Sequence, residues 1–207
     1  MKSFSYWTVE EVVDEFDLIR RKDNQKFKQW LSHSEKIPEG THKKLTMISD
    51  RIDDGGYTWN ETELMMKLIG PLLEQVDYTS TPYETFFTRT ISAPYGKETL
   101  SGIVDFVLAK GTFSPRQPLF FLHEYKKEHD SSNDPLGQLM ISMVAAQLLN
   151  QNDQPIYGAY LLGRYWHFVL LDGKDYSVNL GLNAATNIIE VYQALIYVKR
   201  KVEELTS

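Results

Sequence analysis

The sequence contains no cysteine among its 207 residues. This absence excludes a disulfide framework, thiolate zinc sites, iron–sulfur clusters and cysteine nucleophiles. Long apolar runs are also missing, since no stretch approaches the ~18 consecutive apolar residues of a membrane-spanning helix. The start of the chain is acidic, whereas a secretory signal has a basic segment followed by an apolar one. We therefore expect a cytoplasmic protein without a membrane partner.

Positive charge is in deficit, because 22 lysines and arginines stand against 28 aspartates and glutamates, for a net charge of -6. This balance argues against a protein that coats nucleic acid. It does not exclude an enzyme that acts on nucleic acid, because carboxylates gathered for a divalent cation add negative charge. A helical histidine pair, a Gly-x-Ser-x-Gly elbow and a P-loop are absent as well. Serine-hydrolase and nucleotide-hydrolase functions therefore have no support.

Residues 1–58 are expected to form a helical N-terminal extension of two or three helices. Thr8 and Glu11 have the spacing of a capping box, and apolar residues recur at helical spacing from there to Ile19 and again around Trp30. Thr41 is the expected N-cap of a further helix.

From position 59 the pattern changes and predicts one domain that extends to residue 207. We expect a helix from Asn60 to about position 76, and a buried helix from Asp134 to about position 149. Three strand-like segments lie between them, at 86–91, 102–108 and 118–126, and two more follow at 156–163 and 165–171. This order predicts an α/β (α+β) fold with a central mixed sheet flanked by helices.

A last amphipathic helix is expected over positions 184–205, with an apolar seam whose residues are three and four apart. The seam can pack against helices of the same chain or against a second copy in a homodimer. We favour packing within the chain, because amphipathic helices mostly cover their own core.

Three ionisable residues, Asp105, Glu124 and Lys126, lie in otherwise apolar predicted strands. An unpaired charge in an apolar strand would cost several kcal/mol of folding free energy, so residues of this kind usually have a functional or pairing role. Side chains alternate along a strand, which puts Glu124 and Lys126 on the same side, ~6.5–7 Å apart. If the two strands are neighbours, Asp105 can join them. Two carboxylates at one sheet edge make an oxygen-rich pocket suited to Mg²⁺, and they keep a nearby ammonium charged.

Asp105 and the triplet Glu124-Tyr125-Lys126 resemble the site of the PD-(D/E)xK nuclease superfamily, which has the restriction-endonuclease-like fold. In that superfamily an aspartate and a Glu-x-Lys triplet lie on consecutive strands. The resemblance covers about positions 59–172 and includes the order helix, three strands, helix, strand. The segment that begins at Asn60 also resembles the first core helix of the nuclease domain in type I restriction motor subunits. Val104 departs from the superfamily pattern, which has proline before the aspartate.

The resemblance implies a metal-dependent nuclease that hydrolyses phosphodiester bonds, with DNA as substrate and Mg²⁺ or Mn²⁺ as cofactor. Asp105 and Glu124 would be metal ligands, together with the backbone carbonyl of Tyr125. Lys126 would be the catalytic lysine, which positions the nucleophile or stabilises charge on the transition state.

Two further residues match features that many members share. Members often carry a glutamate on the first core helix, and Glu61 lies on the core-facing stripe of the predicted helix. We therefore expect it to be a further metal ligand. Glu63 stays an alternative ligand, although its capping-box position already accounts for it. Many members also carry a glutamine on the helix after the triplet, where this sequence has Gln138 as an accessory group.

The same residues allow a second interpretation, in which the chain is a catalytically inactive module with a nuclease fold that binds or assembles with partners. Asp105 would then be paired with a buried basic residue. Glu124 and Lys126 would form a salt bridge where their strand enters solvent. Gln138 would satisfy buried backbone groups.

The predicted hairpin around Gly163-Arg164 is rich in aromatic residues that could stack bases or flank a phosphate backbone. Packing within a sheet is the commoner use of such residues. They are Tyr157, Tyr160, Tyr165, Trp166 and His167, with Arg164 among them.

Overall fold

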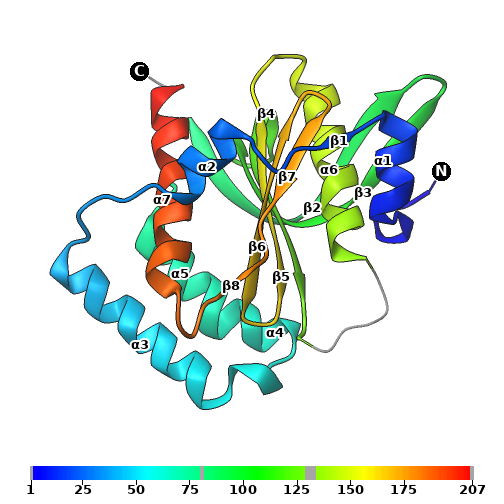
Figure 1. Cartoon of the computed structure of the whole chain (residues 1–207). Helices are drawn as coiled ribbons and strands as arrows, with labels where there is room; N and C mark the ends of the chain where they lie inside the picture. Colours follow the sequence, from blue (N-terminus) through cyan, green and yellow to red (C-terminus); the bar gives the residue numbers. More distant parts are fainter. Residues whose placement is uncertain (1, 80–81, 129–133, 206–207) are drawn as a thin grey trace.

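A computed structural model describes residues 2–79, 82–128 and 134–205 (Figure 1). Its centre is an eight-stranded mixed sheet in the order β1-β7-β6-β5-β4-β3-β2, with β8 paired to β6. The strands are β1 (Ile19–Arg20), β2 (Tyr83–Tyr95), β3 (Glu98–Lys110), β4 (Arg116–Lys126), β5 (Ile156–Leu162), β6 (Tyr165–Asp172), β7 (Asp175–Val178) and β8 (Leu182–Asn183). The predicted α/β class with a mixed, helix-flanked sheet is confirmed.

Strand β4 joins the two halves of the sheet. It pairs antiparallel with β3 on one side and parallel with β5 on the other. The strand of Asp105 and the strand of Glu124 are therefore neighbours, which is the condition under which Asp105 can join Glu124 and Lys126. β1 and β7 are also parallel, and the other pairs are antiparallel.

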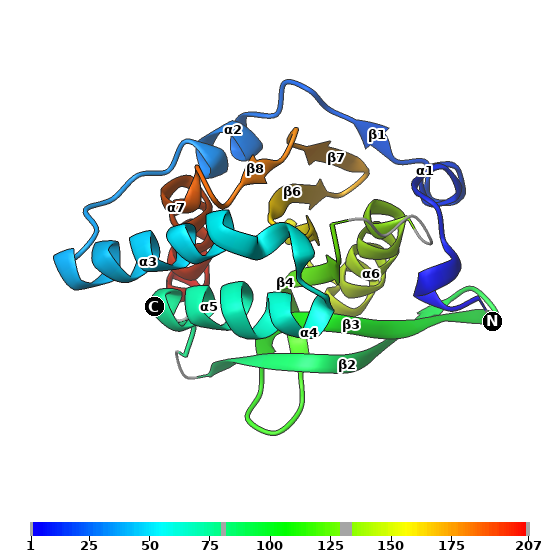
Figure 2. The same cartoon turned by 90° about the horizontal axis from the view of Figure 1, so that it is seen from below.

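Helices cover both faces of the sheet (Figure 1 and Figure 2). One face packs on α6 (Pro135–Asn150), with α1 (Val9–Phe16) beside that helix. The other face is covered by α2 (Gln25–Leu31), α5 (Gly70–Val76) and α7 (Ile188–Glu204), and α3 (Glu39–Gly55) packs on α5 and α7. α6 is buried along most of its length, which explains why its sequence is apolar on nearly every side.

Residues 1–58 supply the expected helices, but they also supply β1, which the sequence did not predict. α1 ends at Phe16 because Asp17 adopts a left-handed conformation with φ 51°. Ile19, expected in that helix, instead belongs to a strand that pairs with β7. α3 starts at Glu39, before the expected cap Thr41. Trp30 is buried in the core, and its indole N–H donates to the Ala194 carbonyl at 2.8 Å.

The predicted helix after Asn60 consists of α4 (Glu61–Leu64), one π-helical turn η3 (Met65–Ile69), and α5. Asn60 and Glu63 form the predicted capping box at its start. Glu61 is the first residue of α4 and is exposed, although its position on the apolar stripe predicted a core-facing side chain. The reason is that the core begins one turn later, at the buried Leu64.

The apolar seam of α7 is buried within the chain, against α2, α3 and α5. The helix begins four residues later than expected, because residues 184–186 form a turn that follows β8. Among the described residues, no helix has both the length and the apolar character that crossing a bilayer requires.

Candidate functional site

Strands β3 and β4 diverge at Asp105. Within the described residues, the pairing of β3 with β4 ends at Phe106 and His123. On the side of Asp105 and Glu124, β3 is paired only with β2, and β4 only with β5. Asp105 lies in this fork, where its Oδ2 accepts a hydrogen bond from the backbone N–H of Tyr125 at 2.8 Å. The carboxylate thus takes the place of a backbone carbonyl as the acceptor of a hydrogen bond between the two strands.

A distortion in β2 lies opposite Asp105. Thr88 has φ 50°, a left-handed conformation that is unfavourable for a β-branched residue. Pairs on both sides of it belong to the ladder, but the pair between Thr88 and Asp105 does not. The alternation of β3 also changes phase here, since Leu100 and Val104 before Asp105, and Val107 after it, all belong to the core beside α6. Such irregularities re-aim side chains in a strand, and here the result is an aspartate directed at β4.

Lys126 links two of the predicted carboxylates. Its Nζ lies 2.8 Å from Glu124 Oε1 and 4.0 Å from Glu61 Oε1. The side chain of Glu124 is only 2% exposed, that of Lys126 14% and that of Glu61 54%. A buried acid, a half-buried base and a solvent-facing acid therefore meet at the end of β4, beside α4.

The ion pair leaves the buried carboxylate incompletely satisfied. Although Lys126 Nζ is close to Glu124 Oε1, the contact lies outside hydrogen-bond geometry, and this buried oxygen accepts no hydrogen bond from the described residues. A buried polar atom of this kind costs free energy unless something else pairs with it.

Burial raises the pKa of Glu124 to about 8, and the nearby Asp105 adds to the shift despite the opposing effect of Lys126. Burial likewise raises the pKa of Asp105, against the Tyr125 hydrogen bond and Lys126, which lower it. For Lys126, burial alone would lower the pKa, but the carboxylates around it, Glu124 first, raise it overall. The site therefore holds more acid than one ammonium neutralises, and it favours a second cation.

The backbone carbonyl of Tyr125 faces the same fork. In a strand, the N–H and C=O groups of one residue point to the same side. The N–H of Tyr125 points to Asp105, so its carbonyl oxygen is directed toward the β3 side of β4. No β3 residue pairs with Tyr125 in the described ladder.

Glu63, the alternative ligand, is engaged elsewhere. Its Oε2 accepts from the N–H of Asn60 at 3.2 Å, and its Oε1 pairs with Lys67 at 2.7 Å. Glu61 instead faces Lys126 and lines a cavity of about 360 Å³, together with Asn60, Thr62 and Lys127. Of the two glutamates, Glu61 is the one at the site.

Gln138 lies one turn into α6 and is buried, with an Oε1 that has no hydrogen-bond partner among the described residues. No hydrogen bond or ion pair in the described parts of the chain joins it to Asp105, Glu124 or Lys126. It lies on the helix that covers the face of Glu124.

As the side chains stand, the described residues contain no group of three or more acidic or histidine side chains arranged to hold a metal ion. Lys126 lies close to both Glu61 and Glu124 and occupies the space that a shared cation would need. Sequence reasoning missed the Tyr125 N–H, which donates to Asp105, and the left-handed Thr88 opposite it in β2. No residue-type signal marks either one.

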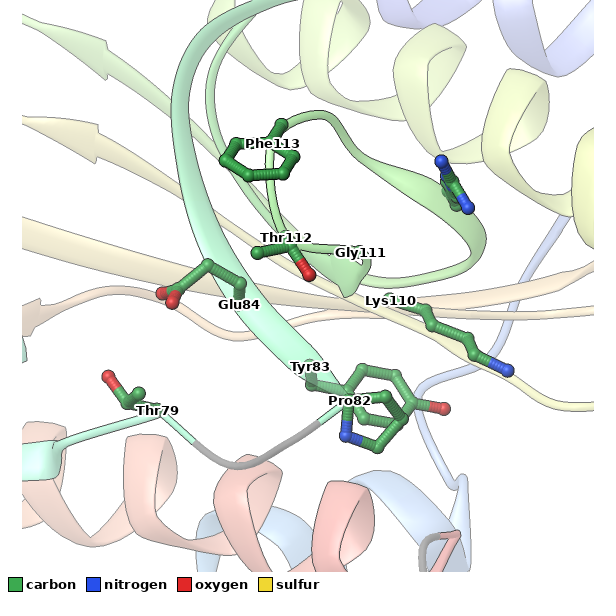
Figure 3. A pocket seen from close by; sticks show the side chains of 9 residues that line it. Thr79, Pro82, Tyr83, Glu84, Lys110, Gly111, Thr112 and Phe113 are labelled. Atoms are coloured by element: carbon green, nitrogen blue, oxygen red, sulfur yellow. The ribbon is translucent and has the colours of Figure 1, made fainter.

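A larger pocket lies at the other end of β3, about 16 Å along the strand from Asp105. Its volume is about 410 Å³, and it includes Lys110, Arg116 and the exposed Phe113 on the β3–β4 loop (Figure 3). None of the predicted site residues lines it, so we do not assign the reaction to it.

Comparison with known proteins adds no assignment, since no protein-family model matches the chain and no curated protein matches its sequence.

Proposed function

We propose that this protein is a metal-dependent nuclease that hydrolyses phosphodiester bonds, with DNA as the substrate that the resemblance implies. The observation that carries the proposal is the fork between β3 and β4, where Asp105, Glu124 and Lys126 meet within an apolar sheet. The proposed setting is the cytoplasm, in keeping with the expectation from sequence.

The donor atoms fit a hard divalent cation. Mg²⁺ and Mn²⁺ prefer carboxylate, carbonyl and water oxygens, and the fork offers Asp105, Glu124 and the Tyr125 carbonyl. Glu124 Oε1 has the Lys126 ammonium beside it but accepts no hydrogen bond from the described residues, so it can take a further positive partner. Glu61 is exposed enough to change its rotamer and act as a further ligand. A bound cation supplies Lewis acidity, which lowers the pKa of a bound water and neutralises charge on phosphate.

The residues of the chain have separate tasks in this proposal. Tyr125 fixes the orientation of Asp105 through its N–H, so one carboxylate is preorganised before substrate arrives. Lys126 stays protonated, because the surrounding carboxylates raise its pKa. Its ammonium can therefore donate hydrogen bonds to an attacking water or to a phosphate oxygen. Gln138 brings an unpaired amide oxygen that can orient a water molecule.

A second candidate function is binding without catalysis. The absence of a preformed three-ligand group among the described residues favours it, since Lys126 would then act as the permanent counter-ion of Glu124. In that case Glu124 and Lys126 form a structural ion pair, and the fork does not bind divalent cations specifically.

Metal titration and cleavage assays separate the two candidates. Mg²⁺ and Mn²⁺ are titrated by calorimetry into the wild type, Asp105→Asn, Glu124→Gln and Lys126→Met, and the same proteins are incubated with single- and double-stranded DNA and RNA. Glu98→Gln, at the exposed start of β3, is the matched control. We expect stoichiometric metal binding in the wild type and the control, and its loss in the Asp105 and Glu124 variants.

Cleavage should follow a different pattern. It should require metal and fall by at least about 100-fold in the three site variants. Lys126→Met should still bind metal, which distinguishes a catalytic group from a ligand. A wild type that binds no divalent cation and cuts no nucleic acid contradicts the nuclease proposal and favours the binding module.

A further inference from the structure

A row of paired residues crosses the sheet beside the carboxylates. Glu124 of β4 pairs with Tyr160 of β5, and Tyr160 pairs with His167 of β6. Residues directly opposite one another on neighbouring strands point to the same face of the sheet. Tyr160 and His167 therefore lie on the face of Glu124, about 5 Å and 10 Å across the sheet from it.

The two rings are stacked on one another. Their centroids are 4.5 Å apart and their planes differ by only 2°, so each ring covers part of one face of the other. Gly181, with φ 95°, passes so close to His167 that a Cβ there would lie 2.6 Å from the ring. The other aromatic residues of this hairpin have different places, since Tyr157 and Trp166 are buried in the core on the opposite face.

Both rings line a pocket of about 310 Å³, which we call the Tyr160 pocket. Its other walls include Leu136 at the start of α6, Arg20 of β1, Asn179 and Leu180. Leu180 is 97% exposed. The pocket thus combines flat aromatic rings with an apolar rim.

Arg20 provides a cation without a counter-ion at this pocket. It is exposed, and it has no ion-pair partner among the described residues. Its neighbour Arg21, by contrast, pairs with Asp175 at 3.0 Å. A stacked aromatic pair beside a free guanidinium matches the two parts of a nucleotide, a base that stacks and a phosphate that attracts positive charge.

We infer that the Tyr160 pocket binds an unpaired nucleotide next to the scissile phosphate, its base against Tyr160, which His167 supports from behind, and its phosphate at Arg20. This inference rests on the proposed function, because the carboxylate fork defines which phosphate is scissile. A base within a duplex is already stacked on its neighbours and cannot lie against these rings. The substrate class is therefore single-stranded nucleic acid or a frayed end.

Binding in the absence of metal tests the pocket alone. A short single-stranded oligodeoxynucleotide that contains 2-aminopurine is titrated in EDTA into Asp105→Asn, and both affinity and base fluorescence are followed. Tyr160→Leu, added to this background, keeps apolar volume but removes the stacking surface. Tyr165→Leu is the control, since Tyr165 belongs to the same hairpin but does not line the pocket.

We expect quenched fluorescence on binding, and an affinity about 10-fold or more lower with Tyr160→Leu but not with Tyr165→Leu. Blunt duplex DNA should bind at least about 10-fold more weakly than the single strand. Equal losses in the two leucine variants, or unchanged fluorescence on binding, would overturn the inference. Thermal melting of each variant establishes that it is folded.

The arginine pair supplies an independent measurement. Arg20→Gln should reduce the slope of log affinity against log salt concentration by about 0.7, the value for one phosphate contact to a single strand. Arg21→Gln should leave the slope unchanged, because Arg21 already has a partner. Identical slopes for both variants and for the parent protein contradict the phosphate contact.

Failure of this inference and failure of the proposed function give different results. If cleavage depends on metal but Tyr160→Leu does not change binding, the nuclease proposal is supported and the nucleotide site at the Tyr160 pocket is contradicted. If base stacking and salt dependence are as expected but no metal supports cleavage, the nucleotide site at the Tyr160 pocket is supported. The chain is then a module that binds single strands without cleaving them.

Discussion

Tyr125 donates its backbone N–H to Asp105 Oδ2 at 2.8 Å, at the point where β3 stops pairing with β4. A side chain thus takes over the role of a backbone acceptor and keeps two diverging strands together. The fork that results is the place where polar groups can collect inside the sheet without breaking a regular ladder. Structure and proposed chemistry therefore depend on the same carboxylate.

Asp105→Ala and Asp105→Asn should differ in stability. The alanine variant leaves the Tyr125 N–H without its acceptor and should lose about 1–3 kcal/mol of unfolding free energy. The asparagine variant keeps an oxygen acceptor and should lose less. Urea unfolding of both variants at neutral pH in EDTA measures the difference, and equal losses would show that the hydrogen bond does not hold the fork.

Glu124 should make the folded chain less stable as pH rises. Its pKa is raised to about 8, against 4.5 for an unperturbed glutamate. Between these values the folded state holds a proton that the unfolded state has released, so the unfolding free energy falls with rising pH. Glu124→Gln removes this dependence and should gain stability relative to the wild type, by on the order of a few kcal/mol, between pH 5 and 8.

Thermal melts of the wild type and Glu124→Gln in EDTA at several pH values measure this gain. Mg²⁺ should reduce the gap at pH 8, because a cation bound to the folded chain stabilises the ionised carboxylate of the wild type alone. A gap that does not change with pH would mean that Glu124 is ionised throughout, as a simple partner of Lys126.

Gly137 should tolerate no side chain. A Cβ at this position in α6 would lie 2.5 Å from backbone atoms of residues 7–9, which cannot move aside as a flexible side chain can. Gly137→Ala should therefore cost about 1–3 kcal/mol, although alanine favours a helix. Gly40→Ala in α3 is the control, because nothing lies within 4 Å of its Cβ, and this variant should be neutral or slightly stabilising. Chemical unfolding compares the two.

Sequence patterns predicted the longer elements well, since caps and apolar spacing are local signals. The capping boxes at Thr8 and Asn60 and the N-cap Asp134 are all present in the structure. β1, β7 and β8 were missed, because strands of two to four residues are too short to show periodicity. β1 forms only because β7 offers a partner edge, which is a tertiary effect.

For the candidate site, the sequence indicated which residues come together but not how they are held. Asp105, Glu124 and Lys126 stand out because charge is costly in an apolar strand. The left-handed Thr88 could not be foreseen, since β-branched residues normally avoid that conformation. Likewise, the pairing of Tyr160 with both Glu124 and His167 depends on the register of three strands, which no local pattern fixes.

His123 should remain neutral well below the usual pH for histidine. Burial among aromatic rings lowers its pKa to about 3, and its Nδ1 shares a 2.8 Å hydrogen bond with the Tyr125 hydroxyl. Between pH 6.5 and 3 the unfolded chain takes up a proton that the folded ring does not, so this residue destabilises the fold as pH falls. His123→Phe should remove that loss, while costing stability at pH 7 because the Tyr125 hydroxyl loses its partner.

Urea unfolding at pH 7 and pH 4.5 measures both effects of His123→Phe. The variant should be less stable than the wild type at pH 7, and the difference should shrink or reverse at pH 4.5. His42→Gln, at an exposed position of α3, is the control for acid effects that do not depend on burial. NMR titration of the His123 ring provides the direct check, because a ring that titrates near pH 6.5 would mean that water reaches this side of β4, behind the carboxylate fork.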